Sequence, residues 1–476
     1  MFKKHILSNK TEKDVGERYM GNLEHNLTEG SVIKNLILFS LPFVGSFVLQ
    51  SLYSTVDLFI VSHYAGTYSI SGLNIVAQIT DLVLGIAIGL LSAATVMIAQ
   101  YVGAGKEKEI HKTIETTFTL VIILAVIMTI GMQIFMNPIL HILQTPLESY
   151  QEASNYYRVV ISGILFTFMY NAIANILRGM GDSKNPLYFV VISTGINIIL
   201  DIIFVGKMHM GAGGAALATV IAQMCSVLVS IIYLRKIDFP FDFKLSSFHI
   251  DQEKIKIMFQ IGIPSAFQNF MLNFSLVVLI AVANLLGVYA SAAVGIAAKI
   301  NVIFILPVIA LHAALSAIVG QNVGAGKLKR VEKTAIVELI ISSLYSLFIC
   351  VIMWCFSKEL LSIFTNDAQT LLVGANYFKG HCWDYVIVMP LAYCLSGIFI
   401  GSGHTSYVAV GNTVGALASR IPLAYFLSNI LGWGTLGIGI AYPISTAVTN
   451  IVYIYCLIKG KWKTAVTTKE DMNLSE

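Results

Sequence analysis

The chain has 476 residues, a net charge of +4 at pH 7 and a mean hydropathy of +0.77, with 56% hydrophobic and 12% charged residues. Soluble domains carry about 25% charged residues, so this composition excludes an ordinary soluble protein. The basic residues are spread among the connections between apolar runs, so the charge gives no indication of nucleic-acid binding. We therefore expect an integral membrane protein.

The apolar runs predict membrane-spanning helices. Crossing the hydrocarbon takes about 20 apolar residues, and runs such as residues 119–136 are continuously apolar, whereas strands of a membrane barrel alternate. We therefore expect an all-α polytopic protein. Its twelve predicted spans are 33–61, 69–100, 114–136, 153–177, 186–206, 212–234, 257–283, 289–320, 334–356, 371–399, 405–428 and 435–458.

Lysine and arginine set the expected topology. They gather in the N-terminal segment, in every second connection and in the tail, while the opposite side holds only Lys207 and Lys358. Basic residues favour the cytoplasmic side, so both termini are expected there. The predicted organisation is a cytoplasmic segment (1–30), a six-helix bundle (31–235), a cytoplasmic linker (236–254), a second six-helix bundle (255–458) and a cytoplasmic tail (459–476).

An internal repeat connects the two bundles. The phrase VGAGK occurs at 102–106 and again at 323–327, and LRGMGDS (177–183) corresponds to FIGSGHT (399–405) at nearly the same offset. Matches at one offset indicate duplication. Because six spans return each half to its starting side, the two repeats are parallel.

The repeated GAGK is not a phosphate-binding loop. Such a loop needs G-x-x-x-x-G-K-[ST] between a strand and a helix. Here Glu107 or Leu328 follows the lysine, and no strand is expected before it. We interpret each copy as a helix end whose glycine adopts the left-handed cap conformation. No enzymatic motif and no cofactor site is predicted.

Charged residues inside the spans are candidates for function because they are costly in a membrane. Asn197 and Asp201 share one face of the fifth span, and Asp57 in the first span reaches a similar depth. Two carboxylates with amide and hydroxyl oxygens suit either a small cation such as Na⁺ or a bound proton. Hydrogen bonding between helices is the alternative interpretation. Asp81, Lys299 and Asp384 are further candidates for lining a substrate cleft, and Arg420 is expected to be structural.

At this point the chain resembles the multidrug and toxic compound extrusion (MATE) family of antiporters. The resemblance rests on residues 28–61, both VGAGK turns, LRGMGDSKNP (177–186), NIILDIIF (197–204), GAAL (214–217) and IPLAY (421–425). It implies two bundles around a V-shaped cleft, with a rocker-type motion that exports amphipathic, mainly cationic, drug-like compounds against H⁺ or Na⁺. It also implies a monomer in the bacterial cytoplasmic (inner) membrane. The coupling site implied, for H⁺ or Na⁺, is Asp57, Asn171, Asn197, Asp201 and Thr219.

The chain departs from one branch of the family. NorM-like members carry an acidic residue in helix seven, which is absent here, and Asp384 is not at their second acidic position. The resemblance is therefore to members with the coupling site in the first bundle. The alternative function is a lipid-linked precursor flippase, which needs a cationic cleft. A sensor or scaffold would need a sizeable soluble domain.

Overall fold

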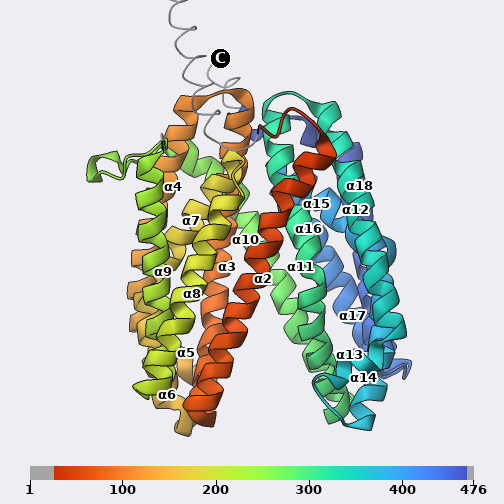
Figure 1. Cartoon of the computed structure of the whole chain (residues 1–476). Coiled ribbons are helices and arrows are strands. Elements are labelled where there is room, and N and C mark those ends of the chain that lie inside the picture. The colour runs from red at the N-terminus through yellow and green to blue at the C-terminus, as the bar shows by residue number, and fades with distance from the viewer. Residues whose placement is uncertain (1–25, 238, 469–476) are drawn as a thin grey trace, which may run out of the picture. The chain divides into compact units, whose positions relative to one another are not determined.

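A computed structural model describes residues 26–237 and 239–468, and within these ranges the chain is helical without strands (Figure 1). Parts of the expected N-terminal segment (1–25) and tail (469–476) lie outside the described residues. The first half contains α2 (Val32–Tyr64), α3 (Gly66–Ala104), α4 (Glu107–Ile134), α5 (Met136–Ile142), α6 (Leu147–Ser162), α7 (Ile164–Met180), α8 (Lys184–Asp201), the π-helical turn η1 (Ile202–Lys207), α9 (Gly211–Lys236) and the 3₁₀ turn η2 (Leu245–Ser247).

The second half repeats this order. It contains α10 (Gln252–Leu285), α11 (Val288–Gly324), α12 (Leu328–Cys355), α13 (Ser357–Ser362), α14 (Ala368–Trp383), η3 (Asp384–Val388), α15 (Met389–Gly401), α16 (Thr405–Thr413), η4 (Val414–Arg420), α17 (Ile421–Tyr425), η5 (Phe426–Ile430) and α18 (Thr435–Ile458). The 3₁₀ turns η6 (Lys461–Lys463) and η7 (Val466–Thr468) follow.

These elements form the twelve spans that the apolar runs predict. Among the described residues, nine helices are long and apolar enough to cross a membrane, and two helix pairs bent by 47° bring the number to eleven. The bent pairs are α6 with α7 and the α14–η3 segment with α15, the fourth span of each half. The remaining span runs through α16, η4, α17 and η5, where α and π turns alternate so that no single α-helix is long.

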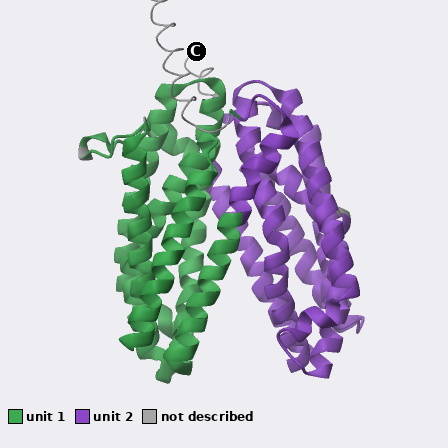
Figure 2. Cartoon of the chain, in the orientation of Figure 1, with its two compact units in different colours: residues 1–26, 45–259 green, residues 27–44, 260–476 purple. Residues whose placement is uncertain are grey.

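The chain divides into two compact units, coloured separately in Figure 2. Among the described residues, unit 1 contains residues 26, 45–237 and 239–259, and unit 2 contains residues 27–44 and 260–468. Two helices are therefore divided: α2 begins in unit 2 and continues in unit 1, while α10 begins in unit 1 and continues in unit 2. A proline lies close to each transition, Pro42 in α2 and Pro264 in α10.

The repeated glycines have two structural uses. Gly105 and Gly326 of the GAGK turns have φ of +68° and +71°, the left-handed conformation that glycine adopts most easily, and Gly105 ends α3 as predicted. Gly179 and Gly401 instead allow helices to approach. A Cβ at Gly179 would come within 2.7 Å of the Thr95 carbonyl oxygen, and one at Gly401 would come still closer to that of Ser316.

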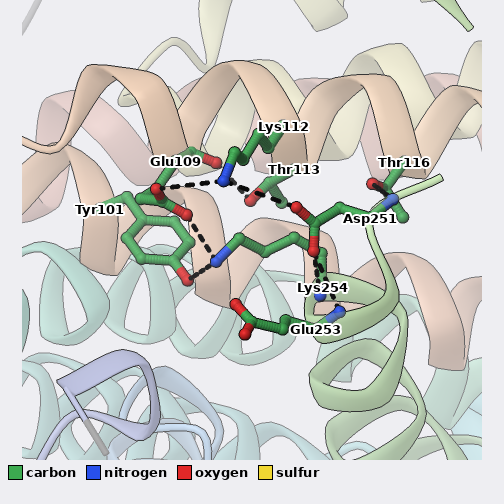
Figure 3. A network of polar contacts seen from close by, with 8 residues as sticks. All are labelled: Tyr101, Glu109, Lys112, Thr113, Thr116, Asp251, Glu253 and Lys254. Atoms are coloured by element: carbon green, nitrogen blue, oxygen red, sulfur yellow. Dashed lines mark hydrogen bonds and ion pairs between the residues drawn. The ribbon is translucent and has the colours of Figure 1, made fainter. Parts of the chain in front are cut away.

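A buried ion pair fixes the start of α10 within unit 1 (Figure 3). The Lys254 ammonium lies 2.7 Å from the Glu109 carboxylate of α4 and donates to the Tyr101 hydroxyl of α3, also at 2.7 Å. The Lys254 side chain is only 1% exposed, whereas Glu109 keeps 28%. A cation as deeply buried as this is stabilised only if partners neutralise it and accept its hydrogen bonds.

Two parts of the segment expected to form a linker, 236–254, pack against α4. Phe241 is 6% exposed, and its ring centroid lies 5.0 Å from that of Phe118. The Asp251 amide donates to the Thr116 hydroxyl, and the Asp251 carboxylate accepts from the amides of Glu253 and Lys254 (Figure 3). Asp251 thus caps α10 and holds the start of this helix beside α4.

The corresponding segment of unit 2 is held differently. Arg330 follows Glu109 by 221 residues, the offset of the two VGAGK copies, and its guanidinium donates to the backbone carbonyls of Glu29 (2.6 Å) and Gly30 (2.8 Å). Asn322 and Lys327 donate to the carbonyls of Leu27 and Thr28. The start of α2 is therefore bound to unit 2 mainly through its backbone oxygens, and Lys327 adds a weak, exposed ion pair of 3.9 Å with the Glu29 carboxylate.

Removing Lys254 should destabilise unit 1. Lys254→Met leaves Glu109 without its closest partner, and we expect a loss of about 2–3 kcal/mol, less than for a fully buried pair because Glu109 still reaches water. The matched control is Lys112→Met, since Lys112 is 49% exposed and lies 3.7 Å from the same carboxylate. That control should change stability by less than about 0.5 kcal/mol. Denaturation of the detergent-solubilised variants measures both, and equal losses would contradict a dominant role of Lys254.

Acid should weaken the Asp251 cap. Partial burial favours a higher pKa for Asp251, but the amides of Lys254 and Glu253 and the Lys112 and Lys254 cations outweigh it and hold the pKa below its usual range. A carboxyl with a lowered pKa in the folded state contributes stability above its unfolded pKa of about 3.9, and this contribution is lost as pH falls further.

Asp251→Asn removes the titrating group and keeps a capping oxygen. The difference in melting temperature between wild type and this variant should be largest near pH 7 and shrink progressively below about pH 4. A difference that stays constant across this range would show that the charge of Asp251 does not stabilise the fold.

Candidate functional site

Two carboxyl groups face each other inside unit 1. Asp57 belongs to α2 and is 6% exposed, and Asp201, the last residue of α8, is fully buried. The two side chains lie within hydrogen-bonding reach of each other. Two ionised carboxylates repel at this separation and neither can donate a hydrogen, so a proton or a cation is required to hold the pair together.

The surroundings of the pair leave buried polar atoms unsatisfied. Asn197 is fully buried one helical turn before Asp201. Five buried atoms of this cluster have no hydrogen-bond partner among the described residues. They are the amide oxygen and nitrogen of Asn197, both carboxyl oxygens of Asp201, and Asp57 Oδ1. Buried polar atoms are normally paired, and clusters of exceptions indicate a ligand or ion site. Carboxyl and amide oxygens are the donors that small hard cations prefer, so the residues present also fit Na⁺.

The five residues implied by the resemblance differ in their placement. Thr219 of α9 is half-buried and accepts a hydrogen bond of 2.9 Å from the Tyr53 hydroxyl, one turn before Asp57. Asn171 of α7 is half-buried, and its amide donates to the Thr167 carbonyl of its own helix at 2.8 Å. Asp57, Asn197 and Asp201 thus form the centre of the cluster, with Thr219 joined to it through Tyr53.

Sequence reasoning did not identify two tyrosines at this site. Tyr53 connects α2 with α9, and Tyr156 of α6 is 7% exposed and lies near Asp57 and Asp201. Tyr53 could have been found from its spacing, since residues four apart share a helix face and it precedes Asp57 by four. Tyr156 carries no comparable signal in the sequence.

The three candidates for cleft lining have different environments. Asp81 of α3 and Lys299 of α11 are exposed, whereas Asp384 of η3 is 5% exposed. Thr446 of α18 lies within hydrogen-bonding reach of Asp384, and the positive charge of Arg420 acts on it. Asp384 is therefore a buried group of unit 2 and not a surface charge.

Arg420 and a histidine organise the polar centre of unit 2. Arg420 Nε donates to the Ser445 hydroxyl at 3.0 Å, and the guanidinium lies 4.6 Å from the Tyr442 ring centroid. The ring of His381 lies 4.3 Å from that of Tyr442 and is 3.2 Å from the Asn301 amide oxygen, which also accepts from Tyr385. These contacts agree with the expected structural role of Arg420.

Metal binding through several acidic, histidine or cysteine side chains is not a feature of this site. Among the described residues there is no group of three or more such side chains that could hold a metal ion. A Na⁺ ion would depend on the two carboxylates of Asp57 and Asp201 together with neutral oxygens. A single proton shared by the pair needs no further ligand.

Comparison with known proteins agrees with this architecture. The MatE family model matches residues 42–203 and 264–426, one stretch in each half. The probable multidrug resistance protein YoeA of Bacillus subtilis (strain 168) is 27% identical over 446 residues, which cover 92% of this chain and 96% of YoeA. The probable multidrug resistance protein YpnP of the same organism is 28% identical over 445 residues, which cover 92% of this chain and 98% of YpnP. A crystal structure of MATE in the bent conformation superimposes with a TM-score of 0.85 at 23% identity, covering 91% of this chain and 96% of that one.

The match extends over both repeats and over more than half of the chain. The relatives are resistance and transport proteins, which confirms the expectation that the chain is a membrane transporter and not an enzyme. The two matched stretches begin at Pro42 and Pro264, the prolines of the internal repeat. The chain belongs to the MatE family.

Proposed function

We propose that this protein is a secondary active multidrug exporter that moves amphipathic, mainly cationic, compounds out of the cell in exchange for H⁺ or Na⁺. The observation that carries the proposal is the buried Asp57–Asp201 pair with its unsatisfied neighbour Asn197. The names of the relatives YoeA and YpnP support drugs as the substrate class. Substrate breadth also fits a chain whose spans are rich in aliphatic and aromatic side chains.

The geometry favours H⁺ as the coupling ion. Asp57 and Asp201 lie within hydrogen-bonding reach of each other, so a proton carried by one carboxyl group would be shared with the other. A Na⁺ ion would instead separate them by its own coordination distances. In the proposed cycle, the loaded pair carries one negative charge instead of two and tolerates burial better, and release of the proton favours a conformation in which water reaches the carboxylates.

Alternating access is proposed to involve the two divided helices. Since α2 and α10 each belong partly to both units, any change of one unit relative to the other has to be absorbed within them. Pro42 and Pro264 lie close to these transitions and remove one backbone hydrogen bond each, which lowers the cost of bending. Asp57 lies on α2 beyond this point, so its protonation can influence the same helix.

A lipid-linked precursor flippase is less well supported. Such a protein needs cations free to bind phosphate, and Arg420 is engaged with Ser445 and Tyr442 inside unit 2. No observation on unit 1 favours an anionic substrate, because its buried charged cluster consists of carboxyl groups.

Substitution of either carboxyl tests the coupling role. Asp57→Asn and Asp201→Asn keep the shape and remove the titrating group, so ethidium efflux from cells or proteoliposomes should fall to the level of the protein-free background. Asp242→Asn is the matched control, because Asp242 is exposed in the 236–254 segment and its loss should leave efflux unchanged. Wild-type efflux by both site variants, at equal expression, would remove the basis of the assignment.

Imposed ion gradients separate the two coupling ions. Proteoliposomes loaded with ethidium should export it when the outside is made acidic, and an inward sodium gradient at constant pH should have no effect. Export driven by sodium alone would assign Na⁺ to the pair. Export that follows neither gradient would contradict secondary active transport.

A further inference from the structure

A carboxyl group that the proposed cycle does not use lies in the first half of α12. Glu338 is the eleventh residue of this 28-residue helix, about 15 Å from its start at about 1.5 Å per residue. Its side chain is fully buried within unit 2. Residue 338 lies inside the expected span 334–356, and an acidic residue inside a span is costly and marks a functional site by default.

The polar groups next to Glu338 do not form hydrogen bonds with its carboxyl group. The closest polar groups are the Ser342 hydroxyl and the Cys394 thiol of α15. Both donate elsewhere, Ser342 to the Leu339 carbonyl and Cys394 to the Ala335 carbonyl, each at 3.3 Å. Accordingly neither carboxyl oxygen of Glu338 has a hydrogen-bond partner among the described residues.

Among the described residues, no cation interacts with this carboxyl. The elements packed against α12 carry these charged or titratable groups: Tyr289, Lys299 and His312 on α11, Lys358 and Glu359 on α13, Tyr377, Lys379, His381 and Cys382 on α14, Asp384 and Tyr385 in η3, and Tyr393 and Cys394 on α15. Only Cys394 of these interacts with Glu338. His312 is directed to the Tyr393 carbonyl, and His381 to Asn301. On α12 itself, Arg330 binds the backbone of residues 27–30.

A buried carboxylate without a cation is so unfavourable that the group takes up a proton instead. A bound Na⁺ is a poor alternative here, because the site offers one carboxyl group and hydroxyls, and no group of three acidic, histidine or cysteine side chains occurs among the described residues. We propose that Glu338 is a proton-binding site of unit 2, loaded while α12 is packed as in this structure and emptied during transport.

Glu338 shares one face of α12 with buried hydroxyl side chains. Thr334, Ser342 and Ser346 stand four and eight residues from it, so they share its helix face, and all three are fully buried. The equivalent of Glu338 in the first repeat, 221 residues earlier, is Thr117, which is buried as well. Thr113, the equivalent of Thr334, is also buried, whereas the equivalents of Ser342 and Ser346 are Val121 and Ala125. The two repeats therefore share only the beginning of the hydroxyl face, and the carboxyl occurs in the second repeat alone.

The proposal rests on the proposed ion-coupled export and adds a second proton to it, in the unit that lacks the Asp57–Asp201 pair. Protonation itself can be observed without transport. The infrared spectrum of the purified protein at pH 7 should contain absorbance from a protonated carboxyl C=O that Glu338→Gln loses. Glu332→Gln, the matched control at an exposed glutamate of the same helix, should retain it. Identical spectra for wild type and Glu338→Gln would show that Glu338 is ionised and overturn the proposal.

Transport distinguishes a cycling proton from a permanently bound one. Under an acidic-outside gradient, Glu338→Gln should lose ethidium export against its concentration gradient while still binding ethidium, and Glu332→Gln should export normally. Glu338→Asp keeps a titratable group and should restore part of the export with a shifted pH profile. Wild-type export by Glu338→Gln would overturn a role in transport.

The two proposals fail in different ways. Wild-type proteoliposomes without proton-driven export would contradict the proposed function and leave the infrared result to decide the state of Glu338. If Glu338→Gln does not fold, Glu338→Asp carries the test through its pH profile of export. A profile identical to that of wild type would then overturn the proposal.

Discussion

Carboxyl groups that are wholly or partly removed from water have to be neutralised or hydrogen-bonded, and the structure meets this requirement in different ways. Glu109 is matched by the Lys254 ammonium at 2.7 Å. The positive charge of Arg420 acts on Asp384. The carboxyl groups of Asp57 and Asp201 lie within hydrogen-bonding reach of each other. Glu338 has no charged partner among the described residues. Since an unpaired buried charge is far too unfavourable to persist, the groups without a cation are those that must bind a proton or an ion.

This distinction separates anchoring from coupling. The Lys254–Glu109 pair lies at the start of α10, where it holds one end of a divided helix in unit 1. The proposed coupling groups lie deeper in the spans, at Asp57, Asp201 and Glu338, where neutrality depends on a proton that can leave. A carboxyl with a fixed cation stabilises one arrangement, whereas a carboxyl with an exchangeable proton stabilises different arrangements in turn.

Much of this could be predicted from the sequence. Continuous apolar runs gave twelve spans, the VGAGK offset indicated the repeat, and helical spacing together with depth pointed to Asp57 and Asp201. The Lys254 network was not predicted, because an exposed loop and a packed one have the same polar composition. Glu338 was also missed: it follows Lys333 by only five residues, and the sequence alone does not separate an interfacial carboxylate from a buried one. The π-helical turns have no periodic signal of their own.

The number of protons exchanged when substrate binds tests this account most directly. Calorimetric titration of ethidium into the purified protein, repeated in buffers of different ionisation enthalpy, gives that number from the slope of the apparent binding enthalpy. The account predicts that wild type releases protons, and that both Asp201→Asn and Glu338→Gln release fewer. An apparent enthalpy independent of the buffer would mean that no carboxyl gives up a proton, and would contradict the central claim.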